Sequence, residues 1–217
     1  MLRFALPNSP NKVIKILCLG AHSDDIEIGC GGTILRLMEE HGPSMEVWWV
    51  VFSSEGPRKR EARNSAKRFL QLASRKTFLV KAFRGSYFPF RGEAIKETFE
   101  EIKSAYSPDI IFTHYRHDLH QDHRVISDLT WNTFRDHVIL EYEIPKYDGD
   151  LGAPNVFVPL EESHSREKIK HLLECFETQR SKRWFSEDTF LSLMRLRGVE
   201  ANATRFAEAF YCRKMVL

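Results

Sequence analysis

The sequence contains few cysteines and has no C-x-x-C pair. Four cysteines occur in 217 residues, and they are scattered at positions 18, 30, 175 and 212. A chain of this length can bury a sizeable core without disulfides, so the scatter argues against a disulfide-stapled secreted domain. We therefore expect reduced thiols and a cytoplasmic protein.

Long apolar runs are also missing. No run approaches the roughly 18 apolar residues of a membrane-spanning helix. The apolar patch at the N-terminus is interrupted by Arg3 and Pro7, which makes it too short for the hydrophobic part of a signal peptide. The sequence thus predicts no membrane span, in agreement with a cytoplasmic location.

Neither sign of charge is in excess. The chain has 32 Lys and Arg against 30 Asp and Glu, a formal net charge of +2. This balance gives no argument for a nucleic-acid partner. A phosphate-binding loop is missing as well, because Gly29, Gly31 and Gly32 do not follow the G-x-G-x-x-G pattern and lie well after the preceding apolar run. We expect a small-molecule substrate.

What the first part of the chain does have is a regular alternation of β-branched apolar runs and amphipathic segments. Such alternation, with fully apolar strand patterns, predicts a parallel sheet covered by helices. The predicted fold is α/β, Rossmann-like and three-layered, with a mostly parallel sheet. Strands are expected at 13–20, 45–53, 77–83 and 109–114, a loop at 21–32, and helices at 33–42, 57–72, 93–106 and 126–134.

After residue 135 the pattern becomes less regular. Short strands are expected at 142–144 and 156–160, helices at 166–180 and 189–197, and the tail 207–217 fits either type of element. No linker composition separates this part from the rest. We therefore predict one domain over 1–217, with a core at about 13–135 and a C-terminal elaboration at about 136–217.

Two clusters of chemically active residues follow predicted strands. The first is AHSDDIE at 21–27, and the second is HYRHDLHQDH at 114–123, which holds four of the nine histidines. Ligands of open parallel sheets bind beyond the carboxyl ends of the strands, where the strand order reverses. If the order is 3-2-1-4, the two clusters share one site.

The residue types of this site suit a divalent metal. Imidazole and carboxylate together form catalytic zinc sites that keep one position open. His22 and Asp25 lie three residues apart, close enough to chelate one ion, and one of the clustered histidines would complete the set. Asp24 would then remain beside the metal as a candidate general base. Two alternatives stay open: Asp24 or Asp25 caps a helix, and the histidine-rich loop is a solvated surface.

The two clusters also resemble the motifs of a known family. AHSDDIEIGCGGTI and HDLHQDHR are similar to the A-H-P-D-D-x-E…G-G-T and H-x-D-H segments of the zinc-dependent de-N-acetylases typified by PIG-L and LmbE-like proteins. Ser23 stands where this family usually has proline, a change expected to soften the turn but to leave the ligands in place.

The resemblance implies a role for each matching residue. His22, Asp25 and His123 would bind one zinc ion per chain, and Asp24 would act as the general base. His120 would stabilise the oxyanion. Asp122 would orient a ligand imidazole. Arg58 matches an arginine that contacts substrate, although Arg60 is a competing alignment. The resemblance assigns no role to His114, His117 or Cys30.

The implied activity is removal of an N-acetyl group from an amino sugar or glycoconjugate, nucleotide-linked ones included. Acetate and a free amine would be the products. A metal-dependent hydrolase of another amide or ester remains the alternative, as does a non-catalytic binding module with the same fold. Relatives often assemble, so a homo-oligomer is among the expected states.

Overall fold

A seven-stranded sheet organises the protein. The computed structural model describes residue 6 and residues 12–216. The strand order is β3-β2-β1-β4-β5-β7-β6, in which the first five strands run parallel and β7 is antiparallel to both its neighbours. The α/β prediction is confirmed, and β1 and β4 are neighbours. The strands are β1 (Ile14–Gly20), β2 (Met45–Val51), β3 (Arg75–Val80), β4 (Ile110–His114), β5 (Val138–Tyr142), β6 (Val156–Leu160) and β7 (Phe206–Tyr211).

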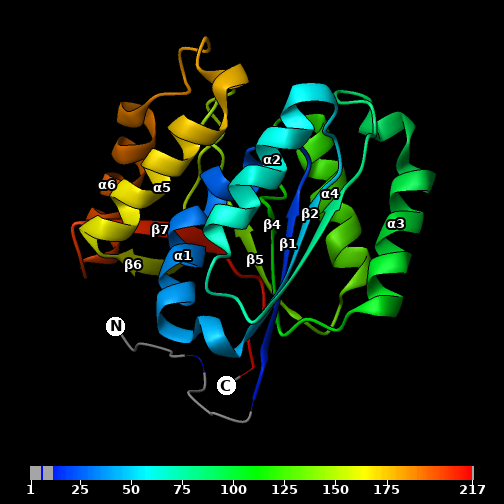
Figure 1. The fold of residues 1–217 in the computed structure, drawn as a ribbon, viewed down its shortest axis with the longest axis horizontal. Helices are drawn as coiled ribbons and strands as arrows, with labels where there is room; N and C mark the ends of the chain where they lie inside the picture. Colours follow the sequence, from blue (N-terminus) through cyan, green and yellow to red (C-terminus); the bar gives the residue numbers. More distant parts are fainter. Residues whose placement is uncertain (1–5, 7–11, 217) are drawn as a thin grey trace.

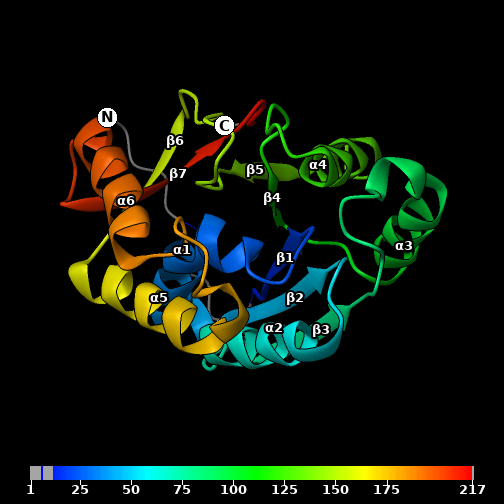
Figure 2. The ribbon, with the colours of Figure 1, turned by 90° about the horizontal axis from the view of Figure 1, so that it is seen from above.

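Helices cover both faces of the sheet and complete the three layers (Figures 1 and 2). On one face, side chains of α1, α2, α5 and α6 pack with the sheet into one apolar cluster, whereas α3 and α4 form a second cluster on the other face. No helix of the described residues has the length and apolar character needed to cross a membrane. The helices are α1 (Asp25–His41), α2 (Gly56–Phe69), α3 (Gly92–Ala105), α4 (Gln121–Thr133), α5 (Glu162–Cys175) and α6 (Glu187–Ala201).

Several predicted boundaries move by a few residues. The predicted strand at 142–144 lies earlier, at Val138–Tyr142, where it continues the parallel sheet beside β4. The predicted helix at 166–180 begins at Glu162 and ends at Cys175. The first residues of the ambiguous tail belong to β7 (Phe206–Tyr211), whose backbone pairs with β5 and β6, whereas residues 212–216 form no regular element. The strand positions reflect pairing partners far away in the sequence, which local periodicity does not reveal.

The start of α1 differs from the loop expected at 21–32. The helix begins at Asp25 and contains Gly29, Gly31 and Gly32, all of them buried. A Cβ on Gly31 would lie 2.8 Å from the ring of Phe69, and one on Gly32 would lie 2.6 Å from Leu160. Glycines weaken a helix by about 1 kcal/mol each relative to alanine, and the close packing that they permit compensates for this loss.

Gly29 offers a direct test of this packing, because a Cβ there would overlap the ring of the buried Tyr142. We expect Gly29→Ala to lower the free energy of unfolding by about 2 kcal/mol, the usual effect of overpacking a core. Urea denaturation measures this change. Gly92→Ala, at the start of α3, is the matched control, because a Cβ added there would meet no side chain or backbone of another part of the protein within 4 Å. Equal stabilities of the two variants would contradict the packing argument.

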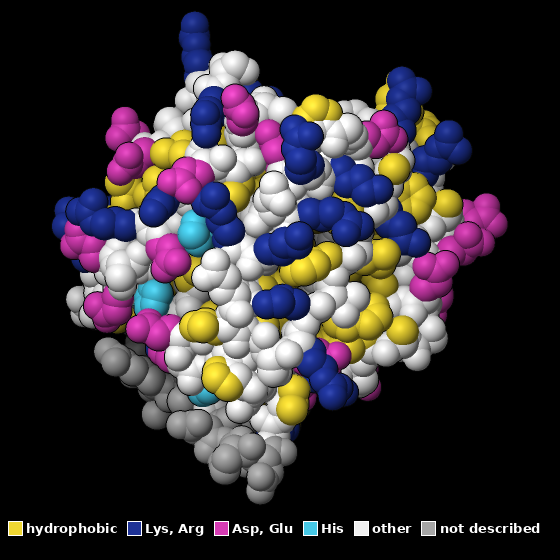
Figure 3. Space-filling model, viewed as in Figure 1, with side chains coloured by type: hydrophobic (Ala, Val, Ile, Leu, Met, Phe, Trp, Pro, Cys, Tyr) yellow, Lys and Arg dark blue, Asp and Glu magenta, His cyan; other side chains and the backbone are white. Residues whose placement is uncertain are grey.

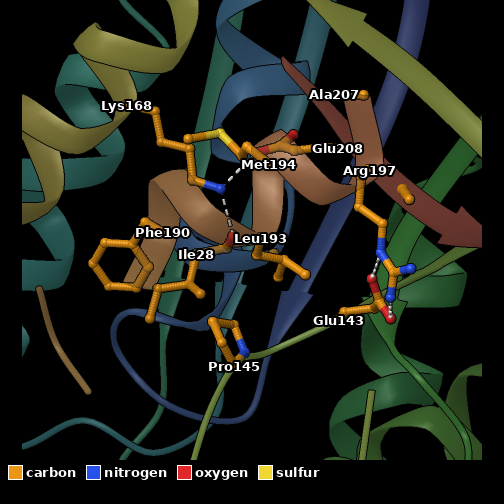
Figure 4. A pocket seen from close by; sticks show the side chains of 12 residues that line it. Ile28, Glu143, Pro145, Lys168, Phe190, Leu193, Met194, Arg197, Ala207 and Glu208 are labelled. Carbon is orange, nitrogen blue, oxygen red and sulfur yellow. Dashed lines mark hydrogen bonds and ion pairs between the residues drawn. The ribbon is translucent and has the colours of Figure 1, made fainter. Parts of the chain in front are cut away.

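Two buried ion pairs lie within the C-terminal part, and the lysine of one of them also contacts α1 (Figure 4). Nζ of Lys168 on α5 lies 2.6 Å from Oε1 of Glu208 on β7, and it also donates to the carbonyl of Ile28 on α1. Arg197 on α6 makes two hydrogen bonds to Glu143, at 2.6 and 2.9 Å. The cavity between the pairs measures about 20 Å³, room for one water molecule but not for a substrate.

Candidate metal centre and active site

The two clusters meet at the carboxyl ends of β1 and β4. These strands pair in parallel, with Ile16 opposite Ile110 and Cys18 opposite Phe112. The segments that follow them therefore leave the sheet side by side. The strand order reverses here, since β2 lies on the far side of β1. One segment leads into α1 and the other into α4, so both helix N-termini border the site.

Three atoms of the predicted ligands form a compact triangle. Nδ1 of His22 lies 3.4 Å from Oδ2 of Asp25. Nε2 of His123 lies 3.2 Å from Nδ1 of His22 and 3.6 Å from Oδ2 of Asp25. Ligands about 2.0–2.1 Å from a tetrahedral zinc ion are about 3.4 Å apart. The two nitrogens and one carboxylate oxygen thus have the spacing and the chemistry of a zinc site with one open position.

Two further histidines lie close enough to be considered as ligands. Among the described residues, potential ligand atoms gather in two overlapping groups, His22–His120–His123 and Asp25–His114–His123. His123 belongs to both groups. The hydrogen bonds of His114 and His120 distinguish these two histidines from the predicted ligands.

His114 ends β4 and is completely buried. Its Nε2 accepts the backbone N–H of Ala21 at 3.0 Å and lies 3.2 Å from Oδ2 of Asp25. The Nε2 lone pair of His114 therefore already accepts a hydrogen bond from the backbone. No motif singles out this histidine, because its bond to Ala21 spans 93 residues. It ties the segment after β1 to the end of β4.

His120 immediately precedes α4. Its Nδ1 accepts the N–H of Asp122 at 3.1 Å, so the neutral imidazole carries its proton on Nε2. Burial, together with the charge of His22, lowers the pKa of His120 and favours this neutral form. The ring lies against those of His22 and His123, with centroids 4.9 and 4.5 Å away. His120 can thus donate a hydrogen bond into the site.

Each candidate ligand histidine is held by a carboxylate on its other nitrogen. Nε2 of His22 lies 3.0 Å from Oδ2 of Asp122, which also accepts the N–H of Ser86. Nδ1 of His123 lies 2.9 Å from Oδ2 of Asp118. Such carboxylate partners fix the orientation of metal-binding imidazoles. Asp122 was among the residues expected at the site, whereas Asp118 was not, although it lies only five residues before His123.

These carboxylates and the degree of burial set the charges of the imidazoles. Burial alone would lower the pKa of His22, but Asp25 and Asp122 outweigh it and raise that pKa to about 9. Burial and the neighbouring His114 lower the pKa of His123 to about 3, so its ring is neutral. A neutral ring with its proton on Nδ1 presents the Nε2 lone pair to the site.

Asp24 lies next to the triangle without belonging to it. It occupies the position before α1, yet its side chain makes no capping hydrogen bond, so helix capping does not account for it. Only 4% of Asp24 is exposed, and burial raises the pKa of its carboxyl group although Arg58 opposes the shift. Nη2 of Arg58 lies 2.6 Å from Oδ1 of Asp24, whereas Arg60 is exposed.

Ser23 stands at the position where the family that the sequence resembles usually has proline. It is fully buried, and its hydroxyl donates to Oγ of Ser54, 2.8 Å away on the segment after β2. A softer turn was expected here, but this hydrogen bond ties the turn to a neighbouring strand end.

Comparison with known proteins identifies the family. The sequence profile described as PIG-L, GlcNAc-PI de-N-acetylase, matches residues 17–134, more than half of the chain. The chain belongs to the PIG-L family. The matched segment contains both clusters and confirms the resemblance found in the sequence. A curated relative of this PIG-L member, the uncharacterized deacetylase YaiS of Escherichia coli (strain K12), is 28% identical over 182 residues, which cover 79% of this chain and 96% of YaiS.

Solved structures share the fold of this PIG-L family member. N,N'-diacetylchitobiose deacetylase from Pyrococcus horikoshii gives a TM-score of 0.73 at 20% identity, covering 96% of this chain and 87% of the other. The 4-carboxy-2-hydroxymuconate hydratase GalB from Pseudomonas putida KT2440 gives 0.68 at 15% identity, covering 94% and 98%. Since one of these proteins is a hydratase, the fold by itself does not determine the reaction.

Proposed function

We propose that the protein is a zinc-dependent hydrolase that removes an N-acetyl group from an amino sugar or glycoconjugate. Water and the acetamide would react to give acetate and a free amine. In this proposal His22, Asp25 and His123 hold one zinc ion per chain, and Asp24 and His120 are the catalytic residues. Membership of a deacetylase family supports the reaction class.

The observation that carries the proposal is a carboxylate beside the ligand triangle that takes no part in it. Asp24 directly precedes Asp25, so the chain places a candidate base one residue from a candidate ligand. Its raised pKa, caused by burial, brings the carboxyl group closer to the neutral range in which general bases are effective. A binding module would have no need of this second carboxylate.

The chemistry divides between the metal and these side chains. A zinc ion held by the triangle would lower the pKa of a water molecule and polarise the amide carbonyl. Asp24 accepts the proton of the attacking water. His120 donates from Nε2 to the oxyanion that develops on the carbonyl oxygen. A proton then returns to the leaving amine from either Asp24 or His120.

Arg58 at the start of α2 contacts the proposed general base. Its guanidinium forms an ion pair with Asp24. Arg58 is also the first of the Lys and Arg residues of α2, whose side chains contribute to the basic surface visible in Figure 3. In the proposed enzyme Arg58 contacts substrate and limits the motion of Asp24. A negatively charged substrate, such as a nucleotide-linked sugar, would be attracted to this surface.

The second candidate is a metal-dependent hydrolase of another amide or an ester. The fold leaves room for it, because the same fold also occurs in a hydratase, GalB, and therefore does not determine the reaction. The same ligand triangle and base would serve it, and only the groups that bind the rest of the substrate would differ.

Metal analysis and acetate release test the proposal together. Protein purified without chelator should contain about one zinc ion per chain. It should release acetate from one or more members of a panel of N-acetylated sugars, nucleotide-linked sugars included. Turnover of simple amides or esters but of no sugar would support the second candidate. Protein that binds no divalent metal and gains nothing from added zinc would overturn the metal assignment.

A further inference from the structure

A lysine with a largely buried side chain pairs with the carboxylate that holds His123. Lys146 follows β5, outside the segment that the family profile matches, and its side chain is only 9% exposed. Its Nζ lies 3.0 Å from Oδ2 of Asp118 and also pairs with Asp150. The proposed function assigns no task to this lysine.

Asp118 connects Lys146 to the metal centre. The Oδ2 atom that faces Lys146 is also the atom that lies 2.9 Å from Nδ1 of His123. The other oxygen, Oδ1, accepts the backbone N–H of His120 at 2.8 Å. A single carboxylate thus holds the ring of one proposed ligand and the backbone of one proposed catalytic residue.

Asp150 holds the same segment from the other side. Its Oδ2 accepts the N–H of Leu119 at 2.7 Å. Gly149 adopts a φ of +63°, a conformation suited to glycine, and this tight turn lies between Lys146 and Asp150. Lys146 therefore sits between two carboxylates that together bind the backbone or side chains of residues 119, 120 and 123.

Because Asp118 is buried, its carboxylate depends on the positive charge of Lys146 for stabilisation. Asp118 is 2% exposed, and a buried carboxylate that loses its cation is strongly destabilised. It would then move toward water or toward another donor, and in either case its bond to Nδ1 of His123 would weaken. A flexible imidazole binds metal less tightly than one that is held in place.

We propose that Lys146 is a positioning residue of the metal centre. It neutralises Asp118 and fixes the oxygen that holds His123, so that Nε2 of His123 faces His22 and Asp25. This inference rests on the proposed function, since it takes these three residues as the ligands. A purely structural lysine would join the loop after β5 to the rest of the protein without any effect on zinc affinity.

Zinc affinity tests the inference independently of turnover. Wild-type protein, Lys146→Met and Lys146→Arg are freed of metal and titrated with zinc in competition with a chelating dye. Lys146→Met should weaken zinc binding by about tenfold, the lower end of the usual effect of a lost carboxylate–histidine partner. Lys146→Arg keeps the charge and should stay within about threefold of wild type. Lys103→Met, on an exposed turn of α3, is the matched control and should leave affinity unchanged.

A double-mutant cycle shows whether Lys146 acts through Asp118. In an Asp118→Asn background, Lys146→Met should add little further loss of zinc affinity, because the carboxylate on which it acts has gone. Circular dichroism verifies that each variant is folded. Should Lys146→Met fail to fold, Lys146→Gln removes the charge but keeps a hydrogen-bond donor, and the same tenfold loss is expected.

The failures of the two proposals give different results. If wild-type protein binds zinc tightly and the folded Met and Gln variants bind it equally well, the positioning role is overturned and the proposed function stands. Additive losses in the cycle also overturn it, since Lys146 would then act independently of Asp118. If wild-type protein binds no zinc, both proposals are overturned.

Discussion

Asp24→Asn should retain zinc and lose about a thousandfold in kcat. General bases typically contribute 10²- to 10⁴-fold to a rate, and a thousandfold corresponds to about 4 kcal/mol of transition-state stabilisation. Asparagine has nearly the same shape as aspartate but cannot accept a proton from water. Asp24 is not a member of the ligand triangle, so the metal content should not change. Metal analysis and steady-state kinetics on the same preparation measure both quantities.

The control for this variant is Asp136→Asn, which changes the same charge at a side chain that is 90% exposed. It should match wild type in zinc content and in kcat. Arg58→Gln is a useful companion variant. The guanidinium forms an ion pair with Asp24, so its loss frees that carboxylate without removing it. Full activity of Asp24→Asn would show that another group accepts the proton, and loss of zinc would show that Asp24 is a ligand.

Lys168→Met should lower the free energy of unfolding by about 3–5 kcal/mol, the usual cost of removing one partner from a buried ion pair. The side chains of Lys168 and Glu208 are 3% and 4% exposed. Glu208 also accepts the N–H groups of Gly32 and Thr33 at 2.8 and 2.6 Å, so its charge is fixed inside the protein. Without the lysine it remains there with no cation. Urea or thermal denaturation measures the loss.

Lys170→Met, two residues away on the exposed side of α5, provides the matched control and should change stability by less than about 0.5 kcal/mol. The double variant Lys168→Met with Glu208→Met should recover part of the loss, because replacing a whole buried pair by apolar groups costs less than breaking it. A Lys168→Met protein as stable as wild type would mean that water reaches Glu208 once the lysine has gone.

Much of the architecture could be predicted because it depends on local patterns. The β-branched apolar runs indicate buried strands, and the amphipathic segments between them require a parallel sheet with helices on its faces. The start of α1 could not be predicted in this way. Three glycines within four residues resemble a loop, and only Tyr142, Phe69 and Leu160, contributed by distant elements, make the close helix packing favourable.

The residues of the candidate site also fall into those that the sequence predicted and those that it did not. His22, Asp24 and Asp25 lie within four residues, and His120, Asp122 and His123 within another four, so their chemistry could be recognised from the sequence alone. Asp118 carried a weak signal, an acidic residue five positions before His123. His114 belongs to the same histidine cluster, but no pattern in the sequence indicates its contact, a hydrogen bond accepted from Ala21 at another strand end.

Contiguous segments of the chain specify the fold class, the family and the kinds of side chain that meet at the site. Which atom of each side chain faces which neighbour depends instead on the packing of distant elements. The spacing of His22, Asp25 and His123 depends on the register between β1 and β4, which brings together residues about a hundred positions apart. The contact between Lys146 and Asp118 depends in addition on the turn after β5. Such contacts result from packing in three dimensions, and no local pattern in the chain specifies them.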